Sequence, residues 1–235
     1  MSERKTVFIE GEYYHLYNRG NSKQEIFLDN QDYDRFVKLL YLCNSIKSFN
    51  FREDIIEKKI DAFDFDRGDL IVSIGAWVQM PNHFHLLITP SPRQPLGEKA
   101  ERAVTFYIGK LCTAYSMYFN KKYKRTGKLF EGVFKSRHII SDEQLKYNFS
   151  YIHLNPIKLI DRAWKEKEIK DVKKTLDFLN KYKWSSYLDY NGVKRCENKI
   201  ISRRDFPDYF SNPESFGEEI LDWLNYEDDN SMSMS

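Results

Sequence analysis

The sequence predicts an α+β fold in which a ferredoxin-like split β-α-β antiparallel sheet is packed by helices and followed by a helical C-terminal accessory segment. Runs of strand composition alternate with segments of helical periodicity in the order β-α-β-β-α-β. A Pro81-Asn82 turn joins the two central runs as a hairpin. The 235 residues, of which 41% are hydrophobic, are enough to bury one large core.

The first half of the chain is predicted to supply a strand, a helix and a hairpin. "TVFIEGEYYHLYNRG", residues 6–20, has the aromatic and β-branched composition of a strand. Asp29 or Asn30 is a candidate N-cap for a helix over residues 31–49. After a charged insertion at about residues 51–69, "LIVSIGAWVQM" predicts a buried strand, and "HFHLLIT" after the turn predicts its partner.

The second half is predicted to continue with a long helix, a strand and a further helix. Residues 96–123 carry one apolar stripe with spacings of three and four, formed by Ala103, Tyr107, Leu111, Ala114 and Tyr118. "KLFEGVFKSRHII", residues 128–140, predicts a strand. Ser141 and Gln144 have capping-box spacing at the start of the next helix. We therefore predict a core domain of residues 1–160 and a charged, helical segment of residues 161–235 with a disordered tail.

Composition restricts the class of protein. Lys and Arg total 37 against 35 Asp and Glu, so the net charge of +2 by itself indicates no polyanionic partner. Three distant cysteines fit neither a disulfide framework nor a cysteine-based zinc site and favour a reducing compartment. No apolar run has the length of a membrane span, and the first residues lack the apolar centre of a signal peptide. We expect a cytoplasmic protein with no membrane partner.

Two of the five histidines stand one residue apart in "PNHFHLLITP". Because side chains alternate along a strand, His83 and His85 are predicted to share one face, whereas Phe84, Leu86 and Ile88 point to the other. Two neutral imidazoles on one face form part of a metal site that needs further oxygen ligands. The alternative is a pair of half-exposed histidines on the surface of a sheet.

The helix after Ser141 supplies a candidate oxygen ligand and a candidate nucleophile. Leu145, Phe149 and Ile152 form its predicted core stripe. A second stripe contains Tyr147, Tyr151 and Asn155, and Asn155 precedes Pro156 at a predicted helix boundary. His153 lies on nearly the opposite side and is the poorer ligand. The alternative for Tyr151 is a half-buried packing residue, and for Asn155 a residue that only ends the helix.

These two patterns together predict phosphoryl chemistry. A divalent ion held by two imidazoles and one amide oxygen keeps coordination positions for phosphate oxygens. A phenol one helical turn from the amide can attack the phosphorus. The resulting phosphotyrosine ester conserves the energy of the bond and can later be attacked by a free hydroxyl, which suits the breaking and rejoining of DNA.

Four motifs, in this order, resemble the single-tyrosine HUH transposases, the IS200-like type: "YHLYNRG", "WVQMPNHFHLLI", "GKLFEGVFKSRHI" and "YIHLNPIK". With the later "WSSY", the chain most resembles the REP-associated tyrosine transposase branch. HUH stands for His83, the bulky Phe84 and His85. The resemblance covers roughly residues 7–190, whereas the interval 51–69 and the chain after residue 190 depart from the compact family core.

The resemblance implies a function and a set of site residues. It implies a ferredoxin-like nuclease core over residues 1–160 and Mg²⁺ or Mn²⁺ held by His83, His85 and Asn155. It also implies attack by Tyr151 on single-stranded or hairpin-associated DNA. The expected products are a 5′-phosphotyrosine and a 3′-hydroxyl. A homodimer, with the tyrosine acting in cis or in trans, is left open.

Basic residues mark candidate DNA contacts. "KKYKRTGK" carries five cations in eight residues, and these would bind phosphates unless they only form a solvated loop: Lys121, Lys122, Lys124, Arg125 and Lys128. Lys135 and Arg137 lie on the strand that follows, and Arg19 lies in the turn after the first strand. Two alternatives to the transposase remain, namely a non-catalytic DNA-binding protein of the same fold and a replication-initiator or relaxase-like HUH nuclease.

Overall fold

The computed structural model describes residues 6–91, 100–164, 169, 171–209 and 212–225. Its centre is a four-stranded antiparallel sheet with the spatial order β2-β3-β1-β4. The strands are β1 (Tyr13–Arg19), β2 (Val72–Met80), β3 (His83–Pro90) and β4 (Lys135–Ile139). This order, with helices between β1 and β2 and between β3 and β4, is that of a split β-α-β sheet and confirms the predicted fold class.

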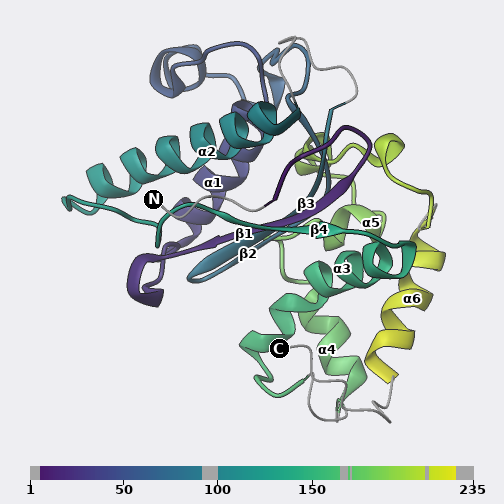
Figure 1. Ribbon diagram of the computed structural model, residues 1–235. Coiled ribbons are helices and arrows are strands. Elements are labelled where there is room, and N and C mark those ends of the chain that lie inside the picture. The colour runs from purple at the N-terminus through teal and green to yellow at the C-terminus, as the bar shows by residue number, and fades with distance from the viewer. Residues whose placement is uncertain (1–5, 92–99, 165–168, 170, 210–211, 226–235) are drawn as a thin grey trace.

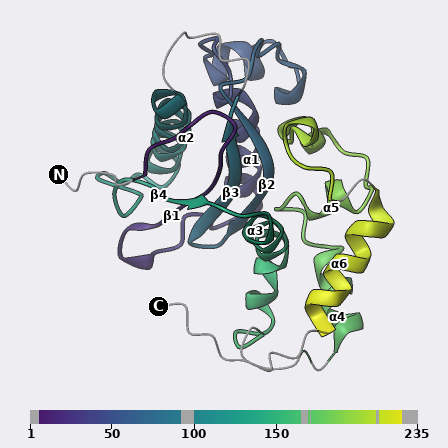
Figure 2. The same cartoon turned by 45° about the vertical axis from the view of Figure 1, so that its right-hand side comes forward.

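Helices cover both faces of the sheet (Figure 1). One face packs against α1 (Asn30–Cys43) and α2 (Ala100–Lys122), and the other packs against α3 (Asp142–Leu154). Figure 2 shows α3 between the strands and α6. The remaining helices are α4 (Val172–Leu179), α5 (Tyr187–Tyr190) and α6 (Pro213–Asn225). Short turns of 3-10 helix occur at Asn21–Lys23, Ala62–Asp64, Asn155–Leu159, Cys196–Ile200 and Arg203–Asp205, and a π-helical turn at Phe51–Glu57.

β1 and β4 are much shorter than their sequence runs predict, and glycines explain the difference. β1 begins at Tyr13 because Glu10 and Gly11 form a turn in which Gly11 has a φ of 79°. β4 begins at Lys135 because Gly127 and Gly132, with φ values of 87° and 134°, bend the preceding segment away from an extended path. The predicted start of the second long helix, at residues 96–99, lies outside the described residues.

The predicted helix starts are formed by side-chain caps. Asp29 is the N-cap of α1, and its carboxylate accepts hydrogen bonds from the amides of Gln31 and Asp32. Ser141 is the N-cap of α3 and accepts from the amide of Gln144 at 3.2 Å. Gln144 returns a bond to the amide of Ile140, one residue before the position expected in a capping box. Both helices therefore start where the sequence predicts.

Two apolar cores lie on either side of the sheet. The first, between the sheet and α1 and α2, also takes in residues of the charged insertion, such as Ile55 and Phe63. The second lies under α3 and includes side chains from the segment after residue 160: Leu179, Tyr187, Phe216, Ile220 and Leu224. Ser185 forms an antiparallel bridge to Val78 of the edge strand β2. The described part of the C-terminal segment thus shares a core with α3.

Among the described residues, no helix combines the length and the apolar character that crossing a membrane requires.

Candidate active site

Strand alternation places the two histidines of β3 on the face of the sheet that α3 covers. Phe84, Leu86 and Ile88 are buried in the core under α1 and α2, as the alternation predicts. His83 and His85 have ring centroids 4.9 Å apart and ring planes at 88°. The pairing of β3 with β1 sets Arg19 opposite His83 and Tyr17 opposite His85. The two imidazoles therefore converge at the end of the sheet where β1 ends and β3 begins.

Hydrogen bonds hold both imidazoles through Nδ1. His15 of β1 places Nε2 at 2.8 Å from Nδ1 of His85, and each of these two residues is 7% exposed. Their rings stack with centroids 4.9 Å apart. The Nδ1 atom of His83 lies 2.6 Å from Oδ1 of Asn82 in the preceding turn. With Nδ1 engaged in both rings, Nε2 is the atom through which each would bind a ligand.

The surroundings of His83 keep its imidazole neutral at neutral pH. Desolvation, followed by the positive charges of Lys158 and Arg19, lowers the pKa of His83 to about 4. A neutral imidazole is the form that binds a metal ion. Desolvation and the neighbouring positive charges thus favour the neutral imidazole of His83, which is the form that can bind a metal ion.

Helix α3 sets the phenol of Tyr151 against the histidines. The ring centroid of Tyr151 lies 5.7 Å from that of His85 and 6.0 Å from that of His15, nearly perpendicular to both. The ammonium of Lys158 donates to the phenol oxygen of Tyr151 over 3.3 Å. Tyr147, one turn earlier, stacks parallel to Tyr151 with centroids 6.1 Å apart. The ring of Tyr151 therefore lies against the imidazoles of His85 and His15, and its oxygen lies beside the ammonium of Lys158.

Asn155 ends α3 and is completely buried at 0% exposure. Neither its Oδ1 nor its Nδ2 has a hydrogen-bond partner. A buried amide without a partner is unfavourable by ~1–3 kcal/mol and calls for an explanation such as a bound ion or water. In the part of the chain that the structure describes, no group of three or more His, Cys, Asp or Glu could hold a metal. The orphaned amide of Asn155 is thus a candidate for contact with a bound ion or water.

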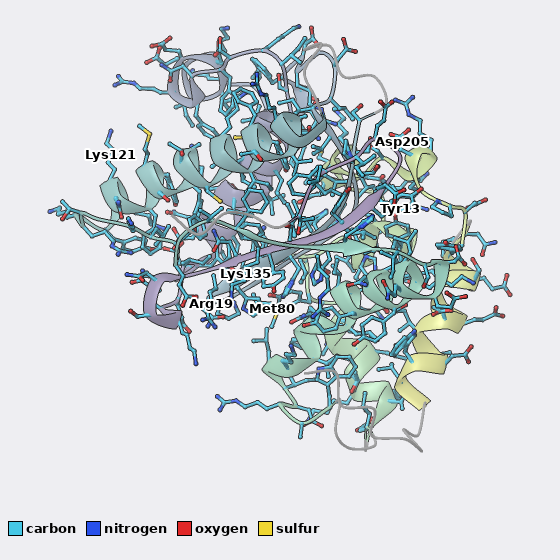
Figure 3. All side chains as sticks on the ribbon, in the orientation of Figure 1. Tyr13, Arg19, Met80, Lys121, Lys135 and Asp205 are labelled. Atoms are coloured by element: carbon cyan, nitrogen blue, oxygen red, sulfur yellow. The ribbon has the colours of Figure 1, made fainter. Side chains whose placement is uncertain are left out.

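Three of the predicted DNA contacts border this site. Arg19 pairs with His83 across the strands, Lys135 pairs with Tyr17, and Arg137 pairs with His15, so all three belong to the face of the histidines. Figure 3 shows Arg19, Lys135 and Met80 at one end of the sheet and Tyr13 at the other. The guanidinium of Arg19 is ion-paired with Glu131. A phosphate would have to displace this carboxylate to bind Arg19.

The other five predicted contacts lie at the end of α2 and in the turn after it. Lys121, Lys124 and Lys128 are exposed. Lys122 is less accessible, because its ammonium pairs with Asp29 and with the fully buried Asp32, each at 2.7 Å. Arg125 donates weakly to the carbonyl of Lys128 at 3.5 Å. Lys122 therefore has a structural role that joins α2 to the start of α1, and DNA contact by this cluster stays a prediction.

Sequence reasoning missed three residues that the fold brings to the site. His15 and Tyr17 alternate with Arg19 on one face of β1, a period-2 pattern that could have indicated them. Lys158 follows Tyr151 by seven residues, which is two helical turns, across the Pro156 boundary. His153 is buried elsewhere, as its helix position predicts, and its Nε2 lies 2.7 Å from Oγ of Ser186.

Comparison with known proteins gives structural matches alone. Neither a scan against protein-family models nor a search of curated proteins finds a match. One solved structure, a REP-associated tyrosine transposase bound to a REP hairpin, matches at 13% identity and a TM-score of 0.44, covering 84% of this chain and 90% of that one. A putative transposase from Deinococcus radiodurans R1 matches at 16% identity and a TM-score of 0.34, covering 65% and 95%.

Proposed function

We propose that the protein is a transposase-like DNA transesterase that cleaves and rejoins single-stranded DNA through Tyr151. The observation that carries this proposal is the position of the Tyr151 phenol. It lies against the imidazoles of His85 and His15, and its oxygen accepts a hydrogen bond from Lys158. A nucleophile beside candidate metal ligands and a cation is the arrangement that attack on a phosphodiester requires.

His83, His85 and Asn155 would hold the divalent ion, Mg²⁺ or Mn²⁺. Two nitrogen donors and one amide oxygen form an incomplete coordination shell, which leaves positions for water and phosphate oxygens. When bound, the ion would polarise the phosphate and neutralise part of the charge that develops during attack. His15 and Asn82 would orient the two imidazoles through their bonds to Nδ1.

The reaction would proceed by direct displacement at phosphorus. Oη of Tyr151 forms a bond to the phosphorus and loses its proton, and the bond from phosphorus to the 3′ oxygen breaks. The departing oxygen takes up a proton and becomes a 3′-hydroxyl, so the products are a 5′-phosphotyrosine and a free 3′ end. The ammonium of Lys158, at 3.3 Å, would stabilise the negative charge on the phenol oxygen. Attack by a 3′-hydroxyl on the phosphotyrosine rejoins the strand.

The substrate would reach this site along the open end of the sheet. Lys135 and Arg137 are exposed on the edge strand β4, on the same face as the histidines. They would bind phosphates beside the scissile one, with the salt dependence that counterion release imposes. A DNA with a hairpin next to an unpaired segment offers both a fixed position and a flexible strand, so hairpin-associated single strands are the proposed substrate class.

The proposal is tested by incubating the protein with labelled single-stranded hairpin DNA and Mn²⁺ or Mg²⁺, followed by denaturing electrophoresis. A DNA adduct that resists denaturation is expected for the natural protein and for Tyr147→Phe, the matched control one turn away. The adduct should be absent from Tyr151→Phe and absent after removal of divalent ions with EDTA. An unchanged adduct in Tyr151→Phe would refute the proposal. Binding of DNA without any adduct would favour a non-catalytic DNA-binding protein.

A further inference from the structure

A surface cavity of about 490 Å³ lies between α2 and the segment that leads into β4, away from the histidines. Met117 on α2 and Val133 on that segment contribute apolar walls, and both are strongly exposed, at 69% and 65%. Thr113 and Ser116 add hydroxyl groups along the same side of α2, and Lys128 adds an ammonium. The cavity is therefore open, mainly apolar and bordered by a cation.

The dimensions and lining of this cavity suit a flat, apolar ring with polar edges. Ligand sites in proteins commonly have volumes of roughly 300–1,000 Å³, apolar walls and a few polar groups. Large apolar side chains as exposed as Met117 and Val133 contribute little to the core. Unpaired nucleobases stack on aromatic side chains without a requirement for one sequence, and Phe130 is the aromatic residue that lines this cavity. Thr113 and Ser116 could then bond the polar edge of the base.

The charge around the cavity selects an anionic ligand. Lys121, Lys124 and Lys128 surround the turn after α2, and Figure 3 shows Lys121 at the tip of that helix. Within the described ranges, no carboxylate pairs with any of these three ammonium groups, in contrast to Lys122. Lys128 lines the cavity, and Lys121 and Lys124 lie in the chain just before it, so the charge matches a nucleotide, which has an apolar ring and a phosphate.

The cavity adjoins the end of the sheet that carries the candidate active site. The segment that lines it is bonded to β1 and the turn after it, since Glu131 donates to the carbonyl of Arg19 at 2.9 Å and Asn21 donates to that of Leu129 at 2.8 Å. Arg19 lies opposite His83 in the strand pairing. The side chain of Asn18, which faces the α2 side, donates to the carbonyl of Gly132. The end of β1 thus has the candidate active site on one face of the sheet and the cavity on the side of the other face.

We infer that this cavity binds one unpaired nucleobase of the same DNA whose phosphate lies at the histidines. The DNA strand would pass around the edge of the β-sheet at residues 128–134. It would run from Lys128 on the cavity side to Lys135 on the active-site side. The base held in the cavity would fix which phosphate reaches Tyr151. The inference rests on the proposed function for the identity of the DNA, but binding of a base can be measured without cleavage.

The test uses fluorescence anisotropy with a labelled 12-nucleotide thymidine oligomer and a series in which one position at a time is abasic. Thr113→Trp fills the cavity from an exposed helix position, and Phe106→Trp, two turns earlier on the same helix, is the control for added aromatic volume. We expect Thr113→Trp to weaken binding about tenfold, the contribution of one stacked base, and Phe106→Trp to leave it unchanged. Loss of one base at one position should weaken binding to the natural protein by a similar factor and have no further effect in Thr113→Trp.

Several results would overturn the inference. Equal affinities for Thr113→Trp and Phe106→Trp would show that no base enters the cavity. A change in sedimentation of Thr113→Trp, from a dimer to a monomer, would assign the cavity to a second copy of the chain. Adduct formation is measured in parallel on the same variants. If the adduct forms normally and no abasic position weakens binding, only the base site is refuted. If an abasic position weakens binding but no adduct forms, only the transesterase is refuted.

Discussion

The two faces of the sheet are built from the same strands but differ in chemistry. Along β3, Phe84, Leu86 and Ile88 enter a continuous apolar core, whereas His83 and His85 meet polar and aromatic groups on the other face. Packing explains every side chain of the first set. It does not explain two adjacent histidines, an orphaned amide and a phenol beside a lysine on the second. Both faces carry an apolar core, but at the start of β3 only the second face also carries the polar groups of the candidate site.

The first prediction concerns the cleavage rate, which should depend on the face that carries His83. His83→Ala removes a proposed metal ligand and should reduce the cleavage rate at least a thousandfold, while DNA binding changes little because other residues contact the phosphates. Cleavage and anisotropy measured on one preparation check this. Normal cleavage by His83→Ala with divalent metal present would show that the site is misassigned.

A substitution on the opposite face, at Phe84, should change stability and not catalysis. Phe84 is 0% exposed, and its ring packs 4.9 Å from that of Phe36. Phe84→Ala should lower the free energy of unfolding by ~3–5 kcal/mol because it leaves a cavity in the core. The folded fraction at low temperature should still form the DNA adduct. Urea denaturation gives the stability, and a variant that is stable but inactive would contradict the division between the faces.

A third prediction concerns the residue that orients the metal ligand. His15→Leu removes the bond to Nδ1 of His85 and should weaken Mn²⁺ binding about ten- to a hundredfold. His15→Gln, which can still present a donor towards His85, should recover part of that affinity. Isothermal titration with Mn²⁺ provides the measurement. Identical affinities for both variants and the natural protein would make His15 a packing residue.

The smallest expected effect is a pH dependence of stability due to His153. Complete burial lowers the pKa of His153 to about 3, against about 6.5 in an unfolded chain. Because the folded pKa is the lower one, the unfolded chain binds the proton first, and stability is lost as the pH falls below about 6.5. The loss from this residue between pH 8 and pH 5 should be about 2 kcal/mol.

Urea midpoints across this range, compared with His153→Gln, isolate that contribution. The substitution keeps a polar group near Ser186 but cannot be protonated, so its stability should vary less with pH than that of the natural protein. Parallel pH profiles for the two proteins would show that His153 does not titrate as its burial implies.

The sequence was sufficient to predict the order of the strands, the faces of β3 and the stripe that carries Tyr147 and Tyr151. These follow from periods of 2 and 3.6, which are local properties. The contact of His15 with His85 was not predictable in the same way, because it depends on the register between β1 and β3. The ion pair of Lys122 with Asp32 was also missed, since it joins residues 90 positions apart. Local patterns identified candidate groups, and only the fold showed which of them meet.

We expect the phenol of Tyr151 to become covalently linked to DNA. The most direct measurement is peptide mass spectrometry of the protein after reaction with hairpin-associated single-stranded DNA and Mn²⁺ and subsequent nuclease digestion. A nucleotide should be attached through phosphate to the peptide that contains Tyr151. A nucleotide on Tyr147 or another residue, or cleaved DNA with no modified peptide, would contradict it.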